Sequence, residues 1–412
     1  MPSSDRSSVN RLRGLFGGVI ILYFIIALEV LIMISPFAAF FYAAFNPVLL
    51  FFAQWPATSW LTAFFLPHMV SPPGFLLQTV RLAGSALFVV GAVVFFVCMA
   101  QVYFHKFFRQ DPALGGLYRW IRHSQYLALE ATGLGLAILW PRFLTVVLWV
   151  AMVAIYYLLA RDEERRMVNQ FGDQYREYMT RTGMFFPRNV ERAVGRLLPP
   201  QKSPMVRSLL GFTILVVVAV GGAFALRAYT VDQLPLWSEG RITAIPILPA
   251  DSIMLEHRMA DLLQLPEVKS RLDPSSQPIL VYVVPQNYVM QGMIADTGQK
   301  WRLFEEHQTI AMITDWIVHP FRHLQGGDMS MHHDMGGVTA ADSPESGDKV
   351  RRLIFLRLDS PSSSNARAAV FGITTARVPL FFADVDMHSL TLVDIQDLGP
   401  GTGWGRVPTP MF

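Results

Sequence analysis

The stretch "GLYRWIRHSQYLALEATGLGLAILW", residues 116–140, places basic and aromatic side chains directly before an apolar run. Tyr118, Arg119 and His123 precede the run, and Glu130 lies inside it. Two interpretations are open at this point. Such side chains anchor a helix at the lipid–water interface, or they form a site for a charged molecule at the edge of a membrane.

Composition favours a membrane protein. The chain has 412 residues, of which 52% are hydrophobic, and its mean hydropathy is +0.36. Soluble proteins of this size rarely reach that value, so membrane spans are expected. Residues 1–229 hold nearly all long apolar runs and carry 20 Lys/Arg against 10 Asp/Glu, whereas residues 230–412 carry 14 against 21. The sequence therefore predicts a multi-span α-helical membrane domain over 1–229, followed by a mixed α/β water-soluble domain over 230–412.

Five segments have the length and apolar character of spans. They are residues 15–35, 75–104, 124–140, 143–160 and 208–227. Residues 36–73 are apolar but broken by prolines, and either a kinked hairpin or an interfacial segment fits them. The basic charges flank apolar runs, so a nucleic-acid partner is not indicated.

Basic loops predict the orientation. Residues 105–123 and 161–207 are rich in Lys and Arg, and the positive-inside rule places such loops in the cytoplasm. The span at 208–227 then carries residues 230–412 to the outer side. We therefore expect a multi-pass protein of a bacterial inner membrane, with a periplasmic domain.

The same topology predicts a meeting of two polar segments. Residues 124–140 and 143–160 form a helical hairpin, so the chain after residue 160 returns to the segment 118–126. Two adjacent carboxylates, Glu163 and Glu164, stand at that return. We expect them near the histidine and the tyrosines of the first segment.

Three further residues refine this picture. Tyr126 and Glu130 are spaced i, i+4 and share a helix face. A carboxylate inside a span faces a bundle interior or a cavity and is a functional candidate. Gly172 is expected to end or bend the helix that follows the carboxylates.

The segments "GLYRWIRHSQY", "DEERRMVNQFGDQYREY" and "FFP" resemble the integral-membrane methyltransferases that include isoprenylcysteine carboxyl methyltransferase and the phospholipid N-methyltransferases. The resemblance covers roughly residues 100–190. It implies a membrane-embedded enzyme that moves a methyl group from S-adenosylmethionine to a lipid-like or membrane-associated acceptor.

The resemblance also implies roles for particular residues. Carried over by position, the cofactor-binding residues are Tyr118, His123, Ser124, Gln125, Tyr126, Glu163 and Glu164. Substrate contacts fall on Glu130 and Arg161. No catalytic residue is identified and no metal is expected in this site. The expected partners are a membrane lipid or lipidated acceptor, and membrane proteins that bind residues 230–412.

Four positions depart from the family pattern. Ser124 replaces its proline, Ala128 replaces its glycine, and Gln110 and Leu159 stand where carboxyl methyltransferases have a histidine and an arginine. These differences favour an alternative function. In this alternative the protein is a non-catalytic scaffold or accessory subunit of a membrane complex, which retains the fold and binds partners through its outer domain.

The acidic half has patterns of both strands and helices. The expected strands are "PILVYVVP", "RLIFLRL", "RAAVFGITT" and "HSLTLVDIQ", and the expected helices are "DSIMLEHRMADLLQ" and "FEEHQTIAMITDWIVHPF". The segment "MSMHHDM", residues 329–335, has side chains that suit copper, or it is a glycine-flanked loop. The one cysteine, Cys98, excludes an intrachain disulfide.

Overall fold

The computed structural model describes residues 48–67, 70, 74–105, 108, 114–197, 203–248, 250–272, 277–286, 350–359, 370–373 and 375–398. Several predicted features lie outside these residues. They are the span at 15–35, the helix at 304–321, the segment 329–335 and the departure at Gln110.

The chain forms two compact units. The first comprises Met1–Asn46, Ala83–Ala137 and Thr145–Ala219, and the second comprises Pro47–Leu82, Ile138–Leu144 and Val220–Phe412. Long helices contribute residues to both units, so the units are not successive in the chain. The division into a membrane domain over 1–229 and an outer domain over 230–412 stays a prediction.

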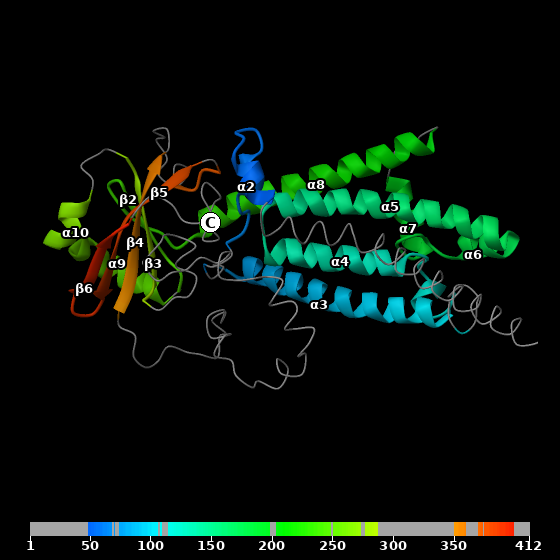
Figure 1. The fold of residues 1–412 in the computed structure, drawn as a ribbon, viewed down its shortest axis with the longest axis horizontal. Coiled ribbons are helices and arrows are strands. Elements are labelled where there is room, and N and C mark those ends of the chain that lie inside the picture. Colours follow the sequence, from blue (N-terminus) through cyan, green and yellow to red (C-terminus); the bar gives the residue numbers. More distant parts are fainter. Residues whose placement is uncertain are drawn as a thin grey trace, which may run out of the picture. The chain divides into compact units, whose positions relative to one another are not determined.

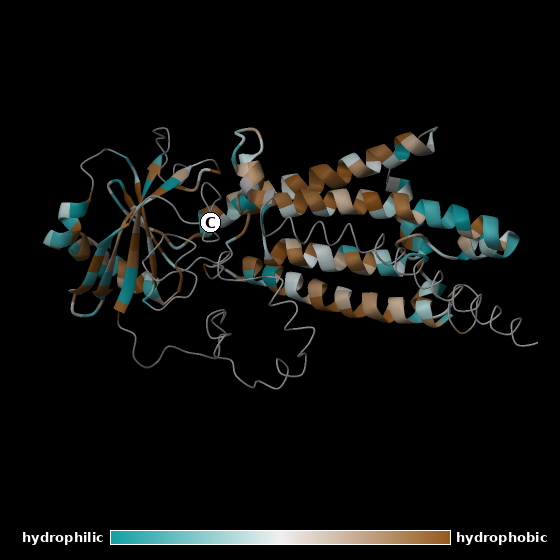
Figure 2. Cartoon of the chain, viewed as in Figure 1, coloured by the Kyte–Doolittle hydropathy of each residue, from teal (hydrophilic) through white to brown (hydrophobic). Residues whose placement is uncertain are grey.

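Long apolar helices dominate the first half of the chain (Figures 1 and 2). Among the described residues, three helices are long and apolar enough to cross a membrane: α3 (Phe75–Phe104), α5 (Phe143–Phe171) and α8 (Pro204–Gln233). They confirm the apolar helices predicted at 75–104, 143–160 and 208–227. Helix α4 (Ser124–Leu139) has 16 residues, fewer than the roughly 20 that a span needs. The proline-broken segment contains only two short helices in its described part, α2 (Val48–Ala53) and η1 (Ser59–Thr62).

Two glycines let α3 and α4 approach closely. A Cβ atom on Gly91 would lie 2.7 Å from the backbone nitrogen of Thr132. A Cβ atom on Gly135 would lie 2.6 Å from the carbonyl oxygen of Gly84 and would also clash with the backbone of Phe88. Small residues at such crossings are typical of helix pairs in membranes, where packing must replace the hydrophobic effect.

Helices α4 and α5 form the predicted hairpin. The rings of Tyr126 and Tyr156 stack with centroids 5.0 Å apart, and the indole N–H of Trp149 donates to the carbonyl oxygen of Glu130 at 2.9 Å. Helix α5 ends at Phe171, and Gly172 has a φ of 57°, which favours glycine. The predicted helix end at Gly172 is therefore confirmed.

Two shorter helices follow this bend. They are α6 (Asp173–Arg181) and α7 (Arg188–Leu197). Figure 2 shows that the end of α5 and much of α6 consist of hydrophilic residues. The charged residues of this region therefore gather where the apolar part of the hairpin ends.

The later region is a six-stranded mixed sheet. Its strands are β1 (Trp237–Glu239), β2 (Ile242–Pro246), β3 (Ile279–Pro285), β4 (Val350–Asp359), β5 (Ala376–Asp386) and β6 (Thr391–Asp397). Their order in the sheet is the order in the chain, with β2 and β3 parallel and every other neighbouring pair antiparallel. A parallel pair needs a crossover, and α9 (Asp251–Leu263) with α10 (Pro266–Arg271) provides it. Buried side chains cover both faces of the central strands.

The predicted strands of this region are partly right. Strands β3, β4 and β6 and helix α9 were expected, but the strand predicted over "RAAVFGITT" is wrong for its described residues, 370–373 and 375, which form no strand before β5. Strand β5 itself was missed. Its Pro379 lacks a backbone donor and pairs with Leu356 where the register shifts, which is the kind of place where a strand tolerates proline.

Two buried arginines organise the second unit. Arg142, in the turn between α4 and α5, donates to the carbonyl oxygen of Thr62. Arg227, on α8, donates to the carbonyl oxygen of Phe64 and, at 2.6 Å, to that of Phe371. Backbone carbonyls of chain-distant segments thus satisfy donors that would otherwise be costly to bury. No local sequence pattern indicates this arrangement.

Candidate functional site

The segment that leads into α4 is held by the segment that follows α6. The backbone N–H of Arg122 donates to the carbonyl oxygen of Gly183 at 2.9 Å, and that of His123 donates to Met184 at 3.1 Å. The hydroxyl of Tyr178 donates to the carbonyl oxygen of Tyr118 at 2.5 Å. The chain after α5 therefore returns to the start of α4, as the hairpin predicted.

A charged centre lies at this junction. His123 has its Nδ1 atom 3.5 Å from Oε2 of Glu163 and its Nε2 atom 3.4 Å from Oε1 of Glu164. Nε of Arg122 donates to the same Oε1 of Glu164 at 2.6 Å. The side chain of His123 is 2% exposed, that of Glu164 13% and that of Glu163 36%. The predicted meeting of His123 with the two carboxylates is therefore present.

Arg122 has a second role in the same place. One of its terminal nitrogens donates to the carbonyl oxygens of Thr182, at 2.5 Å, and of Met179, at 3.2 Å. Its guanidinium thus links the return segment to Glu164. Arg119 and Trp120 are exposed, as interface anchors would be, whereas Arg122 is largely buried.

The carboxylates govern the protonation of the histidine. Burial lowers the pKa of His123, because it disfavours the charged imidazolium. The negative charges of Glu163 and Glu164 act in the opposite direction and outweigh burial, so the pKa of His123 lies above its ordinary value. Burial also raises the pKa of the Tyr118 hydroxyl, which is therefore a hydrogen-bond donor at neutral pH.

Some buried polar atoms of the described residues lack a hydrogen-bond partner. Those in or near this site are Nε2 of His123, Oε2 of Glu163 and both carboxyl oxygens of Glu130. The 3.4 and 3.5 Å contacts around the imidazole are ion pairs without hydrogen-bond geometry. Buried polar atoms are nearly always satisfied, so these atoms are candidates for contact with a ligand.

The remaining predicted residues have protein partners. The hydroxyl of Tyr118 donates to Oε1 of Gln125 at 2.7 Å, and the thiol of Cys98 lies 3.4 Å from the hydroxyl of Ser124. The ring of Tyr126 is stacked between His123, with centroids 5.7 Å apart, and Tyr156. These contacts bring all seven predicted cofactor residues into one neighbourhood.

The two predicted substrate residues lie apart from the charged centre. Arg161 is exposed, lies over the ring of Tyr157 at 5.9 Å, and forms no ion pair with Glu163 or Glu164 among the described residues. Glu130 is 8% exposed and lies one helical turn beyond Tyr126. Sequence reasoning also missed a group of arginines near Arg122. The signal for it was the repeat of arginine at positions 188, 192 and 196.

No family model, curated protein or solved structure matches the chain. Within the part of the chain that the structure describes, no three His, Cys, Asp or Glu side chains are grouped to hold a metal ion. The function must therefore be argued from the site itself.

Proposed function

We propose that the protein is a membrane-embedded methyltransferase. It takes a methyl group from S-adenosylmethionine, bound at the cytoplasmic face of a bacterial inner membrane, and transfers it to a lipid-like or membrane-associated acceptor. The observation that supports this most is the charged centre formed by His123, Glu163 and Glu164, with unsatisfied polar atoms, at the ends of two apolar helices. The family resemblance of residues 100–190 adds to it.

The charges of the centre indicate which carboxylate meets the cofactor. Glu164 pairs with both Arg122 and His123, whereas Glu163 pairs with His123 alone. Glu163 is more exposed, and its Oε2 atom accepts no hydrogen bond. S-adenosylmethionine carries a sulfonium and an ammonium cation, and an incompletely paired carboxylate attracts either of them. Glu163 is therefore the residue through which the chain fits this cofactor.

The protein's other residues would orient the reactants and keep the site dry. The cofactor supplies an activated methyl group, and methyl transfer mainly needs alignment and exclusion of water. Tyr126, stacked between His123 and Tyr156, closes the centre toward the apolar part of α4. Glu130, buried one turn further along, offers two unpaired carboxyl oxygens to a polar group of the acceptor.

Membrane insertion is part of the proposal. Many large apolar side chains of α3 and α8 are exposed, among them Val90, Phe96, Leu209 and Val218. Such surfaces are unfavourable in water and suit a lipid environment. With the basic loops in the cytoplasm, the six-stranded sheet lies in the periplasm.

The test is calorimetric titration of the purified full chain with S-adenosylmethionine. Glu163→Gln should weaken binding by about tenfold or more, since a charge-assisted contact is lost. The control is Glu177→Gln, which removes an exposed carboxylate paired with Arg181 on α6, and should leave affinity within about twofold. Equal affinities of the two variants would remove Glu163 from the site.

One observation favours the scaffold alternative. Most predicted cofactor residues satisfy one another, as Tyr118 with Gln125, Ser124 with Cys98 and Glu164 with Arg122 do. A network of this kind can be purely structural. Wild-type protein that binds no cofactor at millimolar concentration would support this function. Transfer of tritium from labelled cofactor into membrane lipid or protein would instead support the enzyme.

A further inference from the structure

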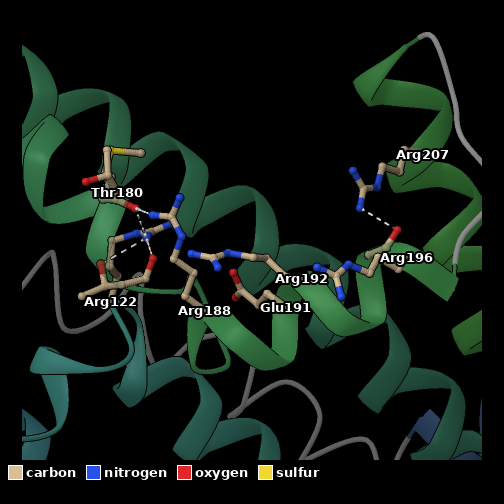
Figure 3. Close-up of a pocket in the computed structure, with 10 residues that line it drawn as sticks. Arg122, Thr180, Arg188, Glu191, Arg192, Arg196 and Arg207 are labelled. Carbon is tan, nitrogen blue, oxygen red and sulfur yellow. Dashed lines mark hydrogen bonds between the residues drawn. The ribbon is translucent and has the colours of Figure 1, made fainter.

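A basic pocket lies beside the charged centre. Its volume is about 710 Å³, and its charged lining residues are Arg122, Arg188, Glu191, Arg192, Arg196 and Arg207. Figure 3 shows these side chains, with Arg207 extending from α8 toward the residues of α7. Helices α7 and α8 and the segment before α4 thus bring five guanidinium groups to one cavity.

The positive charge of this pocket is not balanced within the described residues. Arg122 is paired with Glu164, but neither Arg192 nor Arg196 forms an ion pair there. Glu191, the acidic residue of the lining, uses its Oε1 atom to accept from the backbone N–H groups of Phe185 and Phe186, at 2.9 and 3.2 Å. Hydrogen bonds from the turn before α7 therefore stabilise the negative charge of Glu191.

The spacing of the arginines on α7 is unfavourable without a ligand. Arg188, Arg192 and Arg196 follow one another at i, i+4 and i+8, so their guanidinium groups share one face. Like charges at this spacing destabilise a helix. Val190 and Val194, on the same short helix, are 44% and 51% exposed. A helix with basic and exposed apolar positions suits the surface of an anionic membrane.

We propose that this pocket binds a phosphate-bearing anion. Arginine presents a planar fork of donors that matches phosphate oxygens two at a time, and several such forks around one cavity suit a multiply charged group. Arg122 lies two residues before α4 and Arg207 lies in the first turn of α8, so the pocket is level with helix ends at the proposed cytoplasmic face. Either a lipid headgroup or a free phosphate has the required chemistry. The inference does not depend on methyl transfer.

The experiment uses the purified full chain in a neutral detergent and three probes. These are short-chain phosphatidylglycerol, short-chain phosphatidylcholine and inorganic pyrophosphate, each titrated by microscale thermophoresis. The test variant is Arg192→Gln/Arg196→Gln. The matched control is Arg176→Gln/Arg181→Gln, which removes the same charge from exposed residues of α6 that lie outside the pocket lining.

We expect the pocket variant to bind phosphatidylglycerol at least about tenfold more weakly than wild type, and the control variant to bind within about threefold of it. If the pocket variant loses binding of phosphatidylglycerol but not of pyrophosphate, the ligand is a lipid headgroup. Loss of pyrophosphate binding identifies a free phosphate ester or diphosphate. The thermal midpoint of both variants should stay near that of wild type, since the replaced side chains are exposed. Equal affinities of the two double variants for every probe would overturn the proposal.

Discussion

His123 is held between two carboxylates, and this position decides how the site responds to pH. Glu163 and Glu164 flank its two ring nitrogens, Arg122 lies on the far side of Glu164, and Tyr126 stacks on the ring. When the imidazole is protonated, negative and positive charges alternate across the centre, in the order Glu163, His123, Glu164, Arg122. Loss of that proton leaves no cation between the two carboxylates, and only Arg122, beyond Glu164, still balances their charge.

Stability should therefore fall as His123 loses its proton. Its pKa is raised in the folded chain, so its contribution is complete below about pH 6.5, the ordinary value, and is lost as the pH rises through the raised pKa. The difference in thermal midpoint between wild type and His123→Gln should shrink from about pH 5.5 to alkaline pH. His257→Gln, at an exposed position of α9, is the control. A difference that grows with pH would contradict the assigned ion pairs.

Arg122 should matter far more than its neighbour Arg119. Replacing it by methionine leaves Glu164 without its closest cation and frees two carbonyl oxygens, and breaking a largely buried pair costs about 3–5 kcal/mol of unfolding free energy. Arg119→Met, at an exposed side chain, should change that free energy by less than about 0.5 kcal/mol. Denaturant unfolding in detergent measures both, and similar losses would mean that Arg122 is only an interface anchor.

Among the elements, the contact of α3 with α4 depends on the absence of side chains. Gly135→Val should separate the helices, because the added atoms would overlap the backbones of Gly84 and Phe88. The overlap should lower the thermal midpoint of the purified protein markedly and weaken binding at the charged centre, which begins α4. Gly221→Val on α8 is the control, since nothing lies within 4 Å of its added Cβ. Equal midpoints would show that the helices do not pack at this distance.

Elements with a local signal were predictable, and elements that depend on distant partners were not. Hydropathy and length identify α3, α5 and α8, and the glycine at position 172 marks the end of α5. Strand β5 was not predicted from the sequence, because Pro379 argues against a strand. Only the bulge in the pairing of β5 with β4 shows how the proline is accommodated. The buried ion pair of Arg352 with Asp384, 2.6 Å long, likewise joins two strands whose pairing no local pattern reveals.

The candidate site shows the same division. The hairpin brings His123 to the carboxylates by chain geometry alone, so that contact could be derived from the sequence. The backbone contacts of residues 183 and 184, and the two carbonyl groups bound by Arg122, depend on the path of the chain after α6. The basic pocket needs α7 and the first turn of α8 together.

For the whole molecule, the orientation in the membrane is the property to test. Glu177, on α6, precedes α8 in the chain, and Glu239, on β1, follows it. Both positions are exposed, so a cysteine at either one can be labelled. In a Cys98→Ala background, an impermeant maleimide should label Glu239→Cys in intact cells and label Glu177→Cys only after permeabilisation, because in the proposed topology α8 crosses the membrane between them. Labelling of both positions in intact cells would exclude the proposed topology.

The order of the strands in the sheet has a consequence for biosynthesis. Each described strand after β1 pairs with the described strand that precedes it in the chain, so the sheet can grow at its newest edge while the polypeptide is still being delivered. None of the six described strands has to wait for the C-terminus before it finds a partner. The entropic cost of closure grows with the length of chain between two paired strands, and among the described strands the largest separation in sequence, from residue 285 to residue 350, lies between β3 and β4. Docking of β4 is therefore the step at which vectorial growth of this sheet slows.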